Sequence, residues 1–169
     1  MRRVWVVLIG VCAMATLLGG CGGYRVGTLL PEHIKTIAVP MFVNKTSEPD
    51  LELDATSAVS NQLAIDGTLT VVGEDKGPDV LLTVQIIKYQ RRAIRFTGAT
   101  RPTEYRITVT ALVTLHDLRE DKDLFATQRL SGETDFVIEG SLPESERRAQ
   151  PDALEDLAHD IVERIVEGW

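Results

Sequence analysis

The stretch EYRITVTALVTLHDL, residues 104–118, alternates apolar and polar side chains along its whole length. The apolar positions are Tyr105, Ile107, Val109, Ala111, Val113 and Leu115. The intervening positions are Arg106, Thr108, Thr110, Leu112, Thr114 and His116. Because successive side chains of a strand point to opposite faces, this alternation predicts a long strand with one core face and one polar face. The polar face is rich in threonine rather than in lysine and glutamate.

The segments on either side of this stretch supply its expected strand partners. The sequence PDVLLTVQIIKYQRR, residues 78–92, alternates in a similar way. The sequence LFATQRLSGETDF, residues 124–136, is expected to return as a hairpin through a turn at residues 119–123. Shorter strands are expected at residues 34–39, closed by Pro40, and from Leu69 onward.

Two segments have the apolar spacing of amphipathic helices. The first follows a possible capping box of Ser47 and Asp50 and ends at Gly67, and the second opens at Pro151–Asp152 and ends at Gly168. The apolar positions are Leu51, Ala55, Ala58, Val59 and Leu63 in the first helix, and Leu154, Leu157, Ala158, Ile161 and Ile165 in the second. Residues 22–33, 97–103 and 139–150 are expected to be loops.

This order of elements predicts an α/β fold, a two-layer sandwich in which a mixed four- to five-stranded sheet carries two helices packed on one face. Residues 34–169 are then expected to form a single domain. The other face of the sheet would have no layer from this chain to cover it.

The N-terminus has the organisation of a secretory signal: Arg2 and Arg3, a short apolar core, and then small residues. The sequence LLGGC, residues 17–21, resembles a bacterial lipobox. This resemblance implies that residues 1–20 are a signal peptide and that Cys21 carries acyl chains on its thiol and its new amino group. Several acyl chains on one residue suffice for lasting membrane attachment. A plain secretory signal with an incidental cysteine is the alternative.

Residues 21–33 would then form an acylated tether between the membrane and the domain. Gly22 takes the place of the aspartate that favours inner-membrane retention, which implies sorting to the outer membrane. The protein would be lipid-anchored there on the periplasmic side. Cys12 would leave with the signal, so no disulfide is expected within the mature chain.

The charge balance argues against a nucleic-acid partner, because the chain carries a formal net charge of -7.

We expect no cofactor beyond the covalent lipid on Cys21. The histidines, His33, His116 and His159, do not have metal-ligand spacing, and no metal site is expected. Nucleotide-binding glycine motifs and a G-x-S-x-G nucleophile motif are also missing from the sequence. The protein is therefore not predicted to be an enzyme; an acylated hydrolase is a minor alternative.

A basic patch interrupts this acidic chain. The sequence KYQRRAIRFTGATRPTEY, residues 88–105, has no acidic residue before Glu104. Its cations are Lys88, Arg91, Arg92, Arg95 and Arg101. They are expected to cluster at one end of the sheet, where they could bind an anionic ligand through charge-assisted contacts. The alternative is a hairpin tip that these charges merely keep solvated.

Several short motifs resemble the LptE family of lipopolysaccharide-assembly lipoproteins. They are Cys21-Gly22-Gly23-Tyr24, Leu30-Pro31 before the first strand, NQLAIDG at residues 61–67, and Thr103-Glu104-Tyr105 at the start of the long strand. The resemblance implies a plug inside the outer-membrane β-barrel LptD, which helps the barrel assemble and helps deliver lipopolysaccharide to the cell surface.

The resemblance also places candidate sites. The resemblance implies that the family's lipopolysaccharide contacts fall in the neighbourhood of Arg95 or Arg101, with a second group near Arg147 and Arg148. With the basic patch, this makes Arg91, Arg92, Arg95 and Arg101 the candidate lipopolysaccharide-binding residues. A polar barrel interior would suit a threonine-rich surface, so Thr108, Thr110 and Thr114 are the candidate partner-facing residues.

A second resemblance offers an alternative function. The opening IKTIAVPMFVNKTSEPDLE, residues 34–52, is similar to periplasmic domains of curli-secretion lipoproteins and of lipoproteins that activate peptidoglycan synthases. These are binding or pore-forming modules with other partners.

Overall fold

A computed structural model describes residues 30–98 and 100–167 of the chain. Its elements are β1 (Thr36–Ala38), β2 (Val43–Asn44), α2 (Leu51–Asp66), β3 (Thr70–Val71), the short 3-10 helix η2 (Glu74–Lys76), β4 (Val80–Thr97), β5 (Arg101–Asp117), β6 (Lys122–Val137) and α3 (Leu142–Glu167). The proposed signal peptide and Cys21 lie outside the described residues. Within the described part, no helix is long and apolar enough to cross a membrane.

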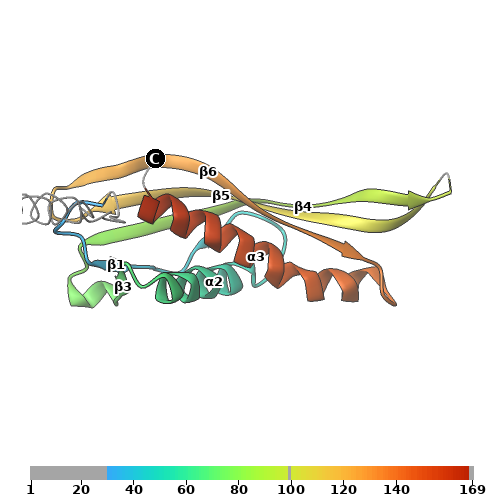
Figure 1. The fold of residues 1–169 in the computed structure, drawn as a ribbon, viewed down its shortest axis with the longest axis horizontal. Helices are drawn as coiled ribbons and strands as arrows, with labels where there is room; N and C mark the ends of the chain where they lie inside the picture. The colour runs from blue at the N-terminus through green and yellow to red at the C-terminus, as the bar shows by residue number, and fades with distance from the viewer. Residues whose placement is uncertain (1–29, 99, 168–169) are drawn as a thin grey trace, which may run out of the picture.

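The strands form one mixed sheet of six strands, in the order β3-β1-β4-β5-β6, with β2 also paired to β4. The pairs that involve β1 and β2 are parallel, whereas β4, β5 and β6 run antiparallel to one another. Both α2 and α3 pack on one side of this sheet (Figure 1). The predicted two-layer α/β sandwich is confirmed, and the two-residue strand β2 accounts for the sixth strand.

The core lies between the helices and the sheet. Ile107, Val109, Ala111 and Val113 are fully buried, so the apolar set predicted from alternation is the helix-side face of β5. Leu63 of α2 and Ile161 of α3 belong to the same apolar cluster. Gly132 of β6 permits the closest approach, since an added Cβ there would lie 2.2 Å from the backbone nitrogen of Leu157 in α3.

The predicted first helix is confirmed, but its start differs from the expected capping box. Asp50 is the N-cap in a left-handed conformation, with φ at 61°, and its side chain makes no capping hydrogen bond. Asn44 instead organises the preceding turn by accepting a hydrogen bond from the Thr46 backbone nitrogen at 2.9 Å. At the other end, Gly67 has φ at 73° and donates its backbone N–H to the Leu63 carbonyl, as the sequence predicted.

The predicted start of the second helix at Pro151–Asp152 is wrong. Helix α3 begins at Leu142, includes Pro151 in its interior, and takes up most of the predicted loop at 139–150. Proline removes only one backbone donor, and the preceding turns have tertiary contacts that hold them helical. Glu146 accepts a hydrogen bond from the Tyr89 hydroxyl at 3.1 Å, and Ser145 and Ala149 are buried.

The predicted loop at residues 97–103 is also mostly strand. β4 continues to Thr97 and β5 starts at Arg101, so the two strands extend as a hairpin beyond the rest of the sandwich (Figure 1). Cross-strand pairing therefore continues where sequence composition indicated a loop.

A bulge in β4 decides which face its cations occupy. The pairing with β5 shifts register between Ile86 and Lys88, which makes Ile87 an extra residue. Without the bulge, Lys88 would share the helix-side face with Ile86. With it, Lys88 pairs with Thr110 on the other face, and Tyr89 pairs with Val109 on the helix side.

Candidate functional site

The sheet face opposite the helices is the candidate site, and we call it the open face. No helix of the described chain covers it (Figure 1). By cross-strand register it presents Lys88, Gln90 and Arg92 from β4, Arg106, Thr108, Thr110, Leu112 and Thr114 from β5, and Arg129, Ser131, Glu133 and Asp135 from β6.

The three predicted partner-facing threonines lie on this face, each tied to β6. Thr108 donates a hydrogen bond to Glu133 at 3.0 Å, Thr110 pairs with Ser131 at 3.0 Å, and Thr114 pairs with Thr127 at 3.0 Å. Thr110 is itself buried, whereas Thr108 and Thr114 are half-buried. The row is therefore a rigid polar surface, and only its two outer members offer accessible area to a partner.

An ion-pair cluster crosses the centre of the open face. Arg106 donates to Asp135 at 2.6 Å and 2.8 Å, and to Glu133 at 3.1 Å. The hydrogen bond from Arg106 holds the pKa of Asp135 below its ordinary value. Both carboxylates are thus paired with the same guanidinium.

Arg91, one of the four candidate lipopolysaccharide-binding arginines, lies on the helix side. It pairs with Glu146 of α3, and its guanidinium carbon lies 5.8 Å from the centre of the Tyr105 ring. Burial, followed by the charge of Glu146, raises the pKa of Tyr89, the other partner of Glu146. Arg91 therefore fastens the hairpin to α3, and the open face loses one of its predicted cations.

The other three arginines differ in their partners. Arg95 forms an ion pair with Glu104 at 2.7 Å. Arg92 and Arg101 are exposed and have no ion pair within the described residues. Of the four candidate arginines, then, Arg92 and Arg101 keep their positive charges unneutralised.

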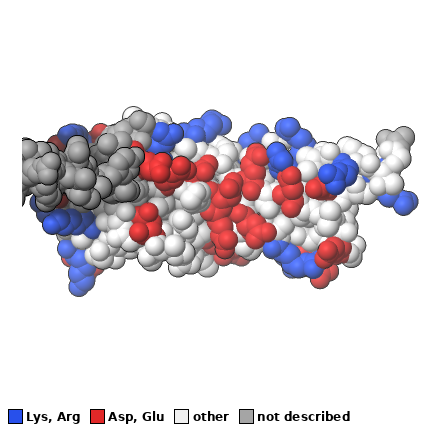
Figure 2. Space-filling view, viewed as in Figure 1, with Lys and Arg blue, Asp and Glu red and all other residues white. Residues whose placement is uncertain are grey.

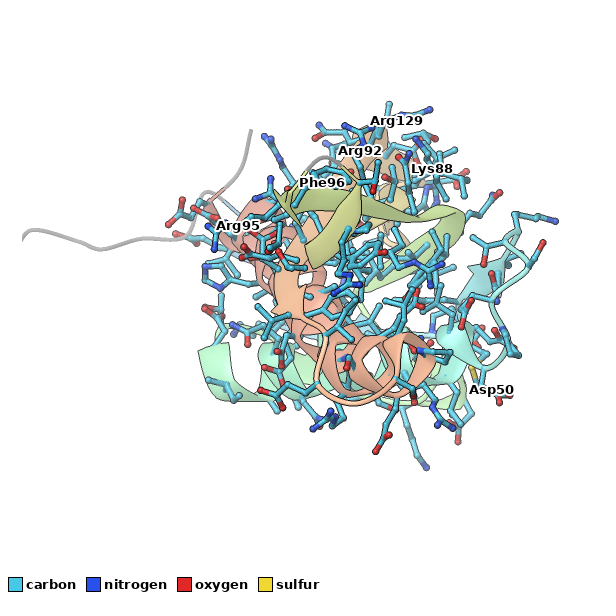
Figure 3. The ribbon with its side chains drawn as sticks, turned by 90° about the vertical axis from the view of Figure 1, so that its right-hand side faces the viewer. Asp50, Lys88, Arg92, Arg95, Phe96 and Arg129 are labelled. Atoms are coloured by element: carbon cyan, nitrogen blue, oxygen red, sulfur yellow. The ribbon has the colours of Figure 1, made fainter. Side chains whose placement is uncertain are left out.

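Two further cations join Arg92 on the open face. Lys88 and Arg129 are exposed and also form no ion pair within the described chain, and in Figure 3 they point with Arg92 away from the helices. The helix-side residue Asp50 lies at the opposite edge of that view. Arg129 was missed by sequence analysis, although its spacing of two from Ser131 and four from Glu133 would have placed it on the same face of a strand.

A shallow groove of about 230 Å³ lies beside Arg92. Its lining is Gln90, Arg92, Ile94, Arg106, Thr108 and Glu133. Ile94 is 40% exposed and Phe96, near the hairpin tip, is 53% exposed. Apolar surface and a cation therefore lie close together, which is an arrangement that can hold an amphipathic anion.

The opposite end of the sheet contains the one trio of metal-ligating side chains found among the described residues, His33, Asp117 and Glu120. Asp117 accepts hydrogen bonds from the His33 ring at 2.8 Å and from the backbone nitrogens of Arg119 and Glu120. Burial acts to raise the pKa of Asp117, but these hydrogen bonds outweigh it and the pKa is lowered. The buried carboxylate thus closes the turn between β5 and β6.

Solved structures share this fold at low sequence identity. The hypothetical protein CT253 from Chlamydia trachomatis aligns with a TM-score of 0.57 and 12% identity over 80% of this chain and 97% of that one. A PelC dodecamer from Paraburkholderia phytofirmans aligns with a TM-score of 0.52 and 14% identity over 85% and 95% of the two chains. A minor lipoprotein from Acinetobacter baumannii aligns with a TM-score of 0.51 and 16% identity over 78% and 91%.

These structural likenesses establish the fold alone. A comparison with curated proteins finds no match. The model of the LptE family, described as lipopolysaccharide-assembly, matches residues 34–167, which span every strand and helix described above. The chain belongs to the LptE family.

Proposed function

We propose that the protein is an outer-membrane lipoprotein, anchored through Cys21 on the periplasmic side, that plugs an LptD-type β-barrel and assists lipopolysaccharide transport and assembly. Membership of a lipopolysaccharide-assembly family supports this proposal. Its role would be binding rather than catalysis.

The open face is the observation that carries the proposal. It is a long polar surface without a covering layer, and its carboxylates Glu133 and Asp135 are already paired with Arg106. Outer-membrane barrels have polar interiors, and a polar wall can hydrogen-bond to Thr108 and Thr114 without burying an unpaired carboxylate. The open face is therefore the surface that we expect to meet the barrel wall.

The hairpin tip is the proposed lipopolysaccharide contact. Arg101 lies at the tip and Arg92 lies further along β4 on the open face; both hold unneutralised charge, and guanidinium groups bind phosphates in a bidentate manner. Ile94 and Phe96 provide exposed apolar area beside them. Arg91 and Arg95 are less suited, because their charges are already paired with Glu146 and Glu104.

Co-purification tests the barrel contact. A tagged full-length protein is expressed with the LptD-type barrel of the same host and extracted in detergent. Thr114→Glu should lower recovery of the barrel at least several-fold, because it would place a carboxylate against the polar wall. Ala64→Glu is the matched control, since Ala64 is exposed on α2, on the helical side of the molecule.

Equal barrel recovery with Thr114→Glu and with Ala64→Glu would contradict the plug face. Recovery of a curli-secretion component or a peptidoglycan synthase in place of the barrel would instead support the alternative functions. Mass spectrometry of the mature N-terminus tests the anchor separately, because acylation at Cys21 adds the mass of its lipid chains.

The same purification tests the lipopolysaccharide contact. Arg92→Gln combined with Arg101→Gln should reduce the amount of lipopolysaccharide recovered per barrel, a ratio that weaker barrel binding alone does not change. Arg95→Gln is the control, because Glu104 already neutralises that side chain. Unchanged lipopolysaccharide recovery in the double variant would remove the hairpin tip from the proposal.

A further inference from the structure

A second surface lies on the outer side of the helical layer, away from the open face. α2 and α3 pack side by side and leave a groove of about 390 Å³ between them. Its lining is Asp54, Ser57, Ala58, Asn61, Gln62 and Ile65 from α2, and Pro151, Leu154, Glu155 and Ala158 from α3. The open-face residues discussed above contribute nothing to this groove.

The floor of the groove is apolar. Leu154 and Ala158 of α3 form part of it, together with the half-buried Ala58 of α2. Ile65 is 78% exposed, the highest exposure among the large apolar side chains of the described chain. Leu154 and Ala158 are already buried, so the apolar area that a partner's side chain can still cover belongs to Ile65 and the half-buried Ala58.

The rim of the groove is acidic. Asp54 and Glu155 are the charged residues of the lining, and no lysine or arginine belongs to it. α2 contains no basic residue at all. From Asp152 to its end, α3 contains one arginine, Arg164, and no lysine. Its acidic residues over the same range are Asp152, Glu155, Asp156, Asp160, Glu163 and Glu167.

Acidic side chains are concentrated near the middle of this side of the molecule. Figure 2 shows them there in several patches, with basic side chains along the upper border and toward both ends. Burial, and then the neighbouring charges of Asp156 and Glu163, raise the pKa of Asp160.

We propose that the groove between α2 and α3 is a docking site for a basic polypeptide segment that carries an apolar side chain between its lysines or arginines. Cations of the segment pair with Asp54 and Glu155, and its apolar side chain covers Ile65 and Ala58. Asn61 and Gln62 are the amide side chains of the lining, and Gln62 lies 3.4 Å from the His159 ring within the chain. An anionic lipid surface or nucleic acid is disfavoured, because the acidic rim repels phosphates.

Fluorescence anisotropy with a defined probe tests this site on the full-length protein in non-ionic detergent. The probe is a labelled peptide of lysine and alanine with one central leucine, and empty micelles provide the blank. Saturable binding is expected, and it should weaken as salt is added. Asp54→Asn combined with Glu155→Gln should raise the Kd by about 3- to 30-fold, since two exposed ion pairs are lost.

Two controls make the test specific to the groove. Glu74→Gln combined with Glu163→Gln removes the same formal charge from outside the lining and should leave the Kd within about twofold. A twin peptide with serine in place of the leucine should bind more weakly, and Ile65→Ser should abolish that difference.

The proposal is overturned by an absence of saturable binding, by equal losses in the two double variants, or by equal affinity for the leucine and serine peptides. The second and third outcomes would indicate attraction by net charge alone. The barrel and lipopolysaccharide assays above do not depend on this result, because they probe the open face and the hairpin tip.

Discussion

The two faces of β5 come from alternating residues of one strand, yet different interactions stabilise them. The helix-side face is stabilised by burial: Ile107, Val109 and Val113 have no exposed surface. The open face is stabilised by directed pairs across strands, such as Thr108 with Glu133 and Arg106 with Asp135. One alternating sequence can therefore build both a core and a binding surface. The core face is stabilised by the apolar area that it buries, whereas the exposed face requires only that its polar groups have hydrogen-bond partners.

The largest effect should come from emptying the helix-side face. Ile107→Ala removes a fully buried side chain, and the expected loss in the free energy of unfolding is about 4 kcal/mol. The neighbouring substitution Thr108→Ala, on the open face, should cost less than about 1 kcal/mol. Urea denaturation of both variants measures the contrast; equal losses would mean that the two faces are not stabilised differently.

Overfilling the same interface should cost nearly as much. The Cβ of Gly132→Ala would lie 2.2 Å from the Leu157 nitrogen and 2.3 Å from the Ala153 carbonyl oxygen, so α3 must move away from β6. We expect a loss of about 3 kcal/mol, measured by thermal or urea unfolding.

Gly73→Ala is the matched control for that substitution. Its added Cβ would contact the side chain of Asp75, which can rotate away, and its backbone φ of -67° suits alanine. A stable Gly132→Ala protein would show that the contact between β6 and α3 is looser than the structure has it.

Acid should weaken the buried end of the sheet. Burial acts to raise the pKa of Asp79. Its carboxylate accepts hydrogen bonds from the Lys35 and Thr36 backbone nitrogens and from the Thr36 hydroxyl, and it pairs with Arg119. These contacts outweigh burial and lower the pKa to about 2. Because this folded-state pKa is below the ordinary 3.8, the stabilisation is complete above about pH 4 and is lost as the pH falls through 2.

The expected size of this acid effect is about 2 kcal/mol, from the difference between the two pKa values. Urea denaturation at a series of pH values from about 1 to about 5 measures it, because this range includes both pKa values. Asp79→Asn should flatten the stability profile in this range, and an unchanged profile would show that another carboxylate carries the acid sensitivity.

The smallest effects should distinguish neighbouring arginines on opposite faces. Arg91→Gln removes the ion pair with Glu146 and should lower the free energy of unfolding by about 1 kcal/mol. Arg92→Gln removes no ion pair and should change stability by less than about 0.5 kcal/mol. If the order is reversed, the bulge does not place these two side chains on the faces assigned to them.

Local pattern accounts for a large part of the fold. The alternation at residues 104–118 predicted both faces of β5, and the apolar spacing before Gly67 predicted α2. Each of these signals depends only on neighbours along the chain, because strand and helix periodicities are properties of the backbone itself. The helical start at Leu142 could not be predicted in this way, since Pro151 is a local stop signal that tertiary contacts of Glu146 and Ser145 override.

The candidate site depended more on the tertiary structure. The sequence by itself determined that basic residues precede β5 and that threonines line one of its faces. Three features of the tertiary structure decide which cations remain unneutralised on the open face. The bulge at Ile87 places Lys88 there, the ion pair with α3 holds Arg91 on the helix side, and strand pairing places Arg129 of β6 on the open face. The register of strand pairing and the ion-pair partner of a side chain both depend on residues that are far apart in the chain. A short stretch of sequence therefore cannot predict either of them.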